Sequence, residues 1–254
     1  MAVVERDNAR PAFRYIGAMG ELSVSEIEWQ ALRVSLAVAL RSALFSLPLA
    51  VCVAWLLTRR RFAGRFLLDA LVHLPLVLPP VLVGYGLLLL FGVRGPAGAW
   101  LQNSLGIRLA FTVQGAALAS AVMTFPLMVR SMRIALETVD TGLEEAARTL
   151  GAGAIDRFAS ITLPLMSPGI LAGLITAFAA ALGEFGAVIT FAGNIPGETQ
   201  TLPLALYSAL QRPDGDLLAG RLALLSLSLG LGGLALAEVA SRLLRRRLGR
   251  PGEA

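Results

Sequence analysis

Five long apolar segments dominate this chain, and each is close to the roughly 20 residues that an α-helix needs to cross a bilayer. They cover residues 34–57, 66–91, 111–129, 165–191 and 222–240. A weaker apolar run over 202–210 is too short to cross, so we expect it at the membrane surface or dipping into it. The pattern predicts an all-α polytopic membrane protein with five transmembrane helices, or six if the run over 202–210 or the N-terminal tail adds one.

Prolines and small residues shape two of these segments. Pro75, Pro79 and Pro80 lie inside the second segment; because proline removes an amide donor and clashes with the preceding turn, the helix must kink or break there. The fourth segment carries small residues that allow close helix contact, at positions 169, 173, 177, 180, 181 and 183.

The composition agrees with a membrane protein, because 56% of the residues are hydrophobic and only 15% are charged. Soluble domains carry about a quarter charged residues. All 22 basic residues are arginine, and a P-loop needs a lysine to reach the phosphates of ATP. With one histidine and one cysteine, zinc or nucleophilic catalysis is not expected either. We therefore predict no catalytic residue, no metal site, no cofactor and no ATP hydrolysis by the chain itself.

The arginines lie beside the apolar segments, which indicates orientation in a membrane rather than nucleic-acid binding. Thirteen lie in the loops after the first and third segments and in the C-terminal tail, against eight in the other loops and the N-terminal tail. The positive-inside rule then places the N-terminus outside and the C-terminus in the cytoplasm. The first 32 residues are predicted to be an external or interfacial tail, with a short interfacial helix over 25–32, and residues 246–254 a cytoplasmic tail.

The polar interval between the third and fourth segments carries a spaced motif. Glu145-Ala146-Ala147 favours a helix, and Gly151 and Gly153 predict its end because glycine adopts the left-handed C-cap conformation at low cost. Ile161, Leu163 and Pro164 follow at a fixed distance. An ordinary amphipathic connector is the alternative interpretation, but it would not need the whole spacing.

This motif resembles the EAA signature of ABC importer permeases. The resemblance implies a type I importer transmembrane domain over residues 33–245, with a cytoplasmic coupling loop at about 137–164 that docks in a groove of an ATPase subunit. The residues that it assigns to ATPase coupling are Glu145, Ala146, Ala147, Gly151, Ile161, Leu163 and Pro164.

Three further stretches, 73–80, 182–187 and 193–203, resemble molybdate ABC transporter permeases, and the likeness runs from about residue 28 to residue 247. Residues 152–156 depart from the family pattern. The resemblance implies a homodimer in the inner membrane with two cytoplasmic ATPase subunits and an external molybdate-binding protein, working by alternating access. A sulfate or thiosulfate permease is the runner-up. A stand-alone secondary anion carrier is a further alternative, although we find no internal repeat, and molybdate and tungstate are too alike to separate.

An acidic residue inside the fourth segment points to a pathway or gate. Glu184 lies within Gly183-Glu184-Phe185-Gly186, about 10 Å from the outer end of its helix at 1.5 Å per residue. Carboxylates inside spans usually face the bundle interior or a wet cavity. Because a carboxylate repels an anionic cargo, Glu184 is expected to shape a gate. Arg41 lies at a similar depth and could pair with it or extend to the interface.

The loop after the fourth segment lies outside by the arginine count, and the pair Pro196-Gly197 predicts a turn in it. One interpretation is a plain connector. The other is that the loop lines the outer mouth and meets the binding protein, since amides and hydroxyls can hydrogen-bond a dianion without gripping it tightly. The residues concerned are Asn194, Pro196, Gly197, Glu198, Thr199, Gln200 and Thr201.

Overall fold

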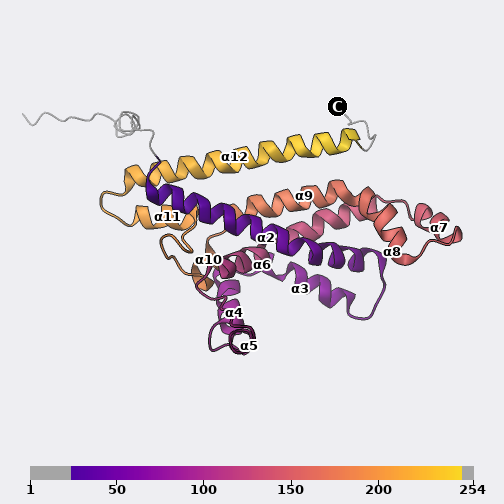
Figure 1. Ribbon diagram of the computed structural model, residues 1–254, viewed down its shortest axis with the longest axis horizontal. Helices are drawn as coiled ribbons and strands as arrows, with labels where there is room; N and C mark the ends of the chain where they lie inside the picture. The colour runs from indigo at the N-terminus through magenta and orange to yellow at the C-terminus, as the bar shows by residue number, and fades with distance from the viewer. Residues whose placement is uncertain (1–23, 248–254) are drawn as a thin grey trace, which may run out of the picture.

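The computed structural model describes residues 24–247, and every regular element in that range is a helix (Figure 1). The all-α prediction is therefore confirmed for this part of the chain. The elements are α2 Glu26–Arg59, α3 Arg65–Val77, α4 Pro80–Phe91, α5 Pro96–Leu105, α6 Val113–Glu137, α7 Thr141–Thr149, α8 Ala154–Arg157, the π-helix η2 Phe158–Thr162, α9 Leu163–Leu182, α10 Gly186–Phe191, α11 Leu202–Leu210 and α12 Asp216–Arg247.

Four helical stretches are long and apolar enough to cross a membrane, namely Glu26–Arg59, Val113–Glu137, Ala154–Leu182 and Asp216–Ala235. The pair α3 and α4 makes a fifth if it is counted as one broken span, with a bend of 118°. The predicted break in the second segment is confirmed, and Pro79 stands at its centre as the N-cap of α4. With nine residues, α11 is too short for a sixth span. The predicted tails lie outside the described residues up to residue 23 and from residue 248.

The helix α2 begins earlier than the predicted tail allows. Ser25 and Glu28 form a capping box, in which each side chain accepts a hydrogen bond from the other's backbone amide. From Glu26 the helix continues without a break to Arg59, so the separate interfacial helix over 25–32 is wrong. The Glu28 carboxylate is also 1% exposed and pairs with Arg221 of α12, at 2.7 Å from Nε to Oε1. A buried charge needs such a partner, and this pair ties the first described helix to the last.

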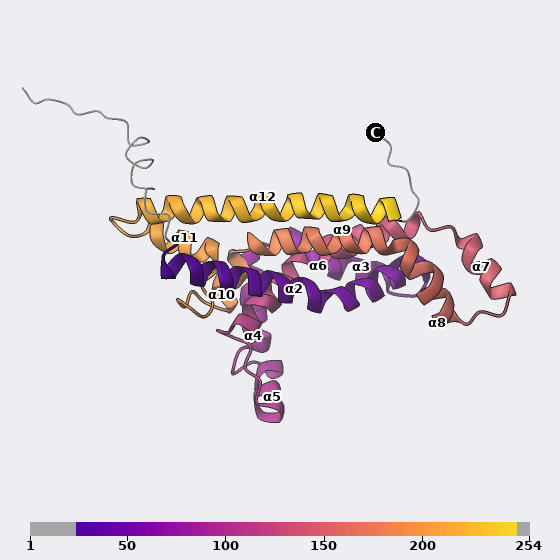
Figure 2. The ribbon, with the colours of Figure 1, turned by 45° about the horizontal axis from the view of Figure 1, so that its top comes forward.

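The helices α2, α6 and α9 form the centre of the bundle, with α12 lying along α9 and α11 beside α2 and α12 (Figures 1 and 2). Small residues let the central helices approach closely, as predicted. A side chain on Gly169 of α9 would meet Cβ of Ala135 on α6, and one on Gly173 would lie 3.1 Å from the carbonyl oxygen of Met128. In this region, van der Waals packing of small faces holds helices together where lipid removes the hydrophobic driving force.

The fourth apolar segment is broken, which corrects the prediction of one continuous helix over 165–191. The helix α9 ends at Leu182, and α10 begins at Gly186. The helix α10 crosses α4 at glycines on both sides: a Cβ on Gly84 would lie 2.6 Å from the carbonyl oxygen of Ala187, and one on Gly186 would lie 2.7 Å from Cβ of Pro80. From this crossing, α4 and α5 project away from the bundle (Figure 2).

Candidate functional site

The helix α7 stands clear of the bundle at the end opposite α11 (Figures 1 and 2). Asp140 caps its start, since Oδ1 accepts a hydrogen bond from the amide of Gly142 at 2.8 Å. The predicted helix over Glu145–Ala147 is confirmed, and α7 contains no buried residue. Exposed apolar side chains follow it, with Leu150 88% exposed and Ile155 85% exposed. Leu150 and Ile155 thus leave apolar surface next to α7 that a partner protein could cover.

The two glycines after α7 have different roles. Gly151 has φ +92°, the left-handed conformation that favours glycine, and the amide of Ala152 bonds back to the carbonyl of Ala147 at 3.0 Å. Gly153 has φ −66° and is the N-cap of α8, so the prediction that both glycines end the helix holds for Gly151 and is wrong for Gly153. One sharp turn at Gly151 therefore sends the chain back towards the bundle.

An acidic residue that the sequence analysis missed anchors α7 to the bundle. Glu144 Oε1 accepts a hydrogen bond from Thr162 Oγ1 at 2.9 Å and lies 3.4 Å from Nη2 of Arg59, at the end of α2. Arg59 also donates to the carbonyl oxygen of Val139 at 3.0 Å, just before α7. The neighbouring Glu145 is exposed and makes no hydrogen bond or ion pair within residues 24–247. Both glutamates suit the surface of a helix, so the sequence does not distinguish them. Only the contacts in the folded chain show that Glu144 is the one that anchors α7.

The second half of the EAA motif lies where the chain re-enters the bundle. The π-helix η2 closes with a hydrogen bond from the Leu163 amide to the carbonyl of Phe158, and π-turns are frequent at functional sites. Pro164 follows as the second residue of α9, where its missing amide donor costs little. Ile161 and Leu163 are half-buried, whereas Pro164 is exposed. These three residues thus position the return of the chain and lie apart from the exposed face of α7.

Aromatic contacts hold the same junction to α2. The rings of Trp55 and Phe158 meet edge to face, with centroids 6.2 Å apart, and the guanidinium of Arg60 lies 5.1 Å from the Trp55 ring centre. Residues 138–162, which we call the coupling segment after the role that the resemblance predicts, are therefore fixed to the ends of α2 and α9, while α7 itself is exposed.

The four residues predicted to form a gate make the break between α9 and α10. Glu184 is half-buried, and its Oε1 accepts a hydrogen bond from the amide of Ala187 at 2.9 Å, which caps α10. The Phe185 ring lies 5.1 Å from that of Tyr207 on α11. Gly183 ends α9, and Gly186 lies at the crossing with α4. Glu184 is thus a helix cap in an irregular stretch, and the depth predicted from a continuous helix does not apply.

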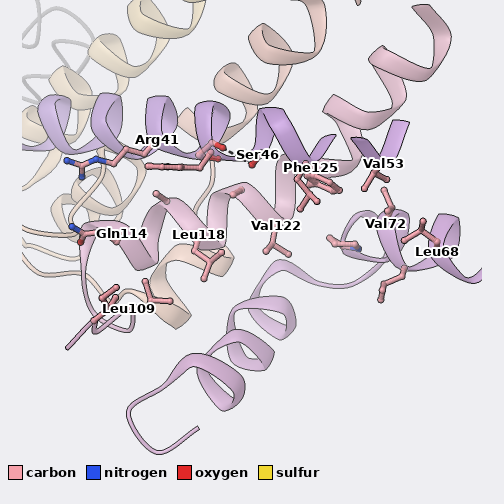
Figure 3. Close-up of a pocket in the computed structure, with 18 residues that line it drawn as sticks. Arg41, Ser46, Val53, Leu68, Val72, Leu109, Gln114, Leu118, Val122 and Phe125 are labelled. Atoms are coloured by element: carbon pink, nitrogen blue, oxygen red, sulfur yellow. Dashed lines mark hydrogen bonds between the residues drawn. The ribbon is translucent and has the colours of Figure 1, made fainter. Parts of the chain in front are cut away.

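Arg41 does not pair with Glu184 within residues 24–247, and it lies instead at one end of a cavity of about 880 Å³ between α2, α3 and α6. Gln114 lies near Arg41 at this end, and Leu68 lies at the other (Figure 3). Most of the lining is hydrocarbon, including Leu118 and Phe125. Such a wall offers few hydrogen bonds to an anion. In residues 24–247 no group of three or more His, Cys, Asp or Glu side chains could hold a metal.

The loop between α10 and α11, residues 192–201, which we call the outer loop after its predicted side of the membrane, is held by its own polar side chains. Gln200 Nε2 donates to Asn194 Oδ1 at 2.9 Å, Asn194 Nδ2 donates to Ser208 Oγ at 2.7 Å, and Thr199 Oγ1 accepts from the Ile195 amide at 3.0 Å. Thr199, Gln200 and Thr201 are buried, so the prediction that they line an open mouth is corrected. Hydrogen bonds replace the water contacts that Thr199 and Gln200 lose on burial, whereas Oγ1 of Thr201 has no hydrogen-bond partner within residues 24–247.

The tip of this loop remains exposed. Ile195, Pro196, Gly197 and Glu198 face outward, and Gly197 has φ +77°, which fits the predicted turn. Three of the seven residues assigned to a binding-protein contact, Pro196, Gly197 and Glu198, are therefore exposed at the tip, where a partner could touch them. Whether they do so stays a prediction.

Comparison with known proteins gives a consistent relationship. Residues 16–249 match the family described as binding-protein-dependent transport system inner membrane component. The molybdenum transport system permease protein ModB of Escherichia coli (strain K12) is 53% identical over 227 residues, covering 89% of this chain and 99% of that protein. The protein of the same name from Haemophilus influenzae is 51% identical and covers 88% of this chain and 97% of its own length.

More distant proteins extend the comparison. The sulfate transport system permease protein CysT of Escherichia coli (strain K12) is 41% identical over 184 residues, which are 72% of this chain and 66% of that protein. A bacterial alginate ABC transporter solved in complex with an alginate pentasaccharide-bound periplasmic protein has the same fold, with a TM-score of 0.69 at 19% identity over 95% of this chain and 85% of that one.

Proposed function

This chain belongs to the family of binding-protein-dependent transport system inner membrane components, and from that premise we propose that it is the permease subunit of an ATP-binding-cassette importer for molybdate or tungstate. It is a non-catalytic membrane subunit. Partner ATPase subunits bind and hydrolyse ATP, an external binding protein delivers the anion, and two copies of this chain enclose the pathway between them.

The coupling segment is the observation that carries this proposal. The helix α7 exposes Glu145 and Ala146, is short for an independent helix, and is nevertheless fixed at its base by Glu144 and Thr162. A rigidly based, exposed helix can push on the bundle when a partner moves it, which a flexible connector could not do. An ATPase that closes on ATP would draw the two coupling helices together and open the permease outward, and hydrolysis would reset it.

The identities of the relatives support molybdate over sulfate as the cargo. The chain is 53% identical to a molybdenum permease over nearly its whole length and 41% identical to a sulfate permease over 72% of this chain. A stand-alone secondary carrier has no use for the coupling segment.

The proposed orientation puts α7 in the cytoplasm and the tip of the outer loop, Ile195–Glu198, outside. The arginine count supports it, and Arg59, Arg133 and Arg148 lie on the elements at the α7 end of the bundle. Reporter fusions at Arg61 and Asp156 should report cytoplasm, and fusions at Gly98 and Gly197 should report the exterior. A cytoplasmic signal at Gly197 would overturn this orientation.

Two neighbouring glycines provide the test of coupling. Gly151→Val places a β-branched residue at φ +92°, which costs on the order of 1–2 kcal/mol or more, and redirects the chain after α7. Gly153→Ala, at φ −66° with open space around it, is the matched control. We expect Gly151→Val to lose ATPase association and molybdate uptake while the protein still reaches the membrane, and Gly153→Ala to keep both. Equal uptake by the two variants would refute the coupling role.

A further inference from the structure

The two halves of the broken span pack against different helices. The helix α4 crosses α10, with Gly84 of α4 close to Ala187 and Gly186 of α10 close to Pro80. The helix α3 packs against α6. Between them the chain bends by 118° at Leu78 and Pro79. Because α3 and α4 pack against different helices, each can move with its own neighbour, and the bend between them can act as a hinge.

Few apolar side chains pack α3 against α6, although α3 has 13 residues. Val72 is its one buried residue, and Leu68 adds partly buried surface. The specific contact is ionic: Nη1 of Arg133 on α6 donates to Oδ1 of Asp69 at 2.6 Å. His73, one turn further along α3, lies with Nδ1 3.3 Å from the same carboxylate oxygen. The position of α3 along α6 is therefore set largely by one carboxylate.

A cavity of about 410 Å³ surrounds this ion pair, and it contains a second cation and a second carboxylate. Arg130 and Glu137 both line it, and neither makes a hydrogen bond or ion pair within residues 24–247. Arg130 lies three residues before Arg133 on α6, and Glu137 lies four residues after it. Positions three and four apart share one helix face, so Asp69 has an alternative arginine about 4.5 Å away along α6, and Arg133 has an alternative carboxylate.

The cluster lies next to the coupling segment. Arg133 is one turn from Glu137, where α6 ends, and Asp69 is one turn from Arg65, where α3 begins. The chain passes from Glu137 into Val139, which Arg59 holds through its carbonyl oxygen, and then into α7. A force on α7 thus reaches α6 one helical turn from the ion pair.

We propose that Asp69, Arg130, Arg133 and Glu137 form a two-position ionic clasp between α3 and α6. In one position Asp69 binds Arg133, as in this structure. In the other position, α3 has moved by about one turn along α6, Asp69 forms an ion pair with Arg130, and Glu137 forms one with Arg133. The clasp transmits motion of the coupling segment to the hinge at Leu78 and Pro79, and so helps to switch the pathway. This inference rests on the proposed transport function. One-turn steps of one element past another are a known form of switching, because packed elements have discrete alternative positions.

Charge reversal distinguishes a two-position clasp from a static bridge. The test uses the full chain with its ATPase and binding protein in lipid vesicles, and it measures molybdate uptake per ATP hydrolysed. Reversing only Asp69→Arg and Arg133→Asp rebuilds the first position but sets two arginines against each other in the second. Reversing all four, with Arg130→Asp and Glu137→Arg added, rebuilds both positions and leaves the net charge unchanged.

We expect the double reversal to assemble and hydrolyse ATP without coupled uptake, and the fourfold reversal to recover uptake. Full uptake by the double reversal would show a static bridge and overturn the proposal, and so would failure of a correctly assembled fourfold variant to recover.

Neutral substitutions keep the proposal testable if the reversed chains do not fold. Arg130→Gln and Glu137→Gln each remove one ion pair from the second position and none from the first, whereas Arg133→Gln removes one pair from each position. Arg130→Gln and Glu137→Gln should therefore shift ATPase activity without cargo in the same direction, each by about fivefold, the population change expected for one ion pair of modest strength, and Arg133→Gln should shift it much less. Opposite shifts in Arg130→Gln and Glu137→Gln, or no shift in either, would contradict the clasp. Wild-type molybdate uptake in the same vesicles tests the transport function separately, since its absence would refute the transport assignment whatever the variants do.

Discussion

Replacing Glu144 with alanine should release α7 from the bundle. The carboxylate accepts one hydrogen bond from Thr162 at 2.9 Å and lies 3.4 Å from Arg59 Nη2, with its side chain 25% exposed. A hydrogen bond to a charged group contributes about 1.5–3 kcal/mol, and an ion pair with this much solvent access adds at most about 1 kcal/mol. Allowing for that exposure, we expect Glu144→Ala to lower the free energy of opening of α7 by about 2 kcal/mol.

Hydrogen exchange measures this opening directly. Every 1.4 kcal/mol changes an equilibrium tenfold, so the amides of α7 should exchange about 30-fold faster in Glu144→Ala. Undocking and unfolding of α7 should coincide, because a nine-residue helix is marginal without a supporting surface. Glu144→Gln keeps an acceptor for Thr162 and should give an intermediate rate.

The adjacent Glu145 is the matched control. It lies on the same helix, is exposed, and makes no contact of this kind within residues 24–247. Glu145→Ala should leave exchange in α7 unchanged in the isolated permease and weaken its association with the ATPase. The reasoning is refuted if the two alanine variants exchange equally, since then Glu144 does not anchor the helix.

Two further predictions concern the crossing of α4 with α10 and the loop that follows α10. Gly84→Leu should disrupt the crossing and lower the melting temperature, because the new Cβ would lie 2.6 Å from the carbonyl oxygen of Ala187. Gly86→Leu has open space around it and should leave the melting temperature unchanged; equal melting temperatures for the two variants would contradict the crossing. Gln200→Ala should speed amide hydrogen exchange in the outer loop, because it removes the 2.9 Å hydrogen bond to Asn194. Glu198→Ala should leave this exchange unchanged and weaken the stimulation of ATP hydrolysis by the binding protein. The reverse pattern would contradict the assignment of an exposed tip and a hydrogen-bonded base.

Sequence alone was sufficient for the features that follow from local chemistry. Long apolar segments specify helices of membrane length, Pro79 and Pro80 specify the break between α3 and α4, and Gly151 specifies the end of α7. Each depends on residues within a few positions of one another, and each was predicted from the pattern.

Features that depend on distant contacts were not predictable in this way. Glu144 and Glu145 are equivalent in the sequence, and only contact with Arg59 and Thr162 shows which one anchors α7. Thr199 and Gln200 are polar residues in a loop between apolar segments, so exposure was the natural expectation, but they are buried and bond to partners within the loop. The ion pair of Asp69 with Arg133 joins positions 64 residues apart, and no local pattern indicates it.

The break at Glu184 was also missed, although its signal in the sequence is local. The apolar residues on both sides led to the interpretation of one helix, in which Gly183 was assigned to packing and the stretch from Gly183 to Gly186 to a gate. The structure shows that Glu184 caps α10, which stabilises a new start for the helix. An acidic residue between two glycines inside an apolar segment is a signal that could have predicted the break.

The central claim is that α7 couples a partner ATPase to anion import through this chain. Its most direct test is ATP hydrolysis by the complete complex in lipid vesicles, with the binding protein loaded with either molybdate or sulfate. We predict that molybdate-loaded binding protein stimulates hydrolysis and drives molybdate uptake in the wild-type complex, and that neither occurs with Gly151→Val. Stimulation and uptake that persist in Gly151→Val would contradict coupling through α7, and stronger stimulation by sulfate-loaded binding protein would contradict the proposed cargo.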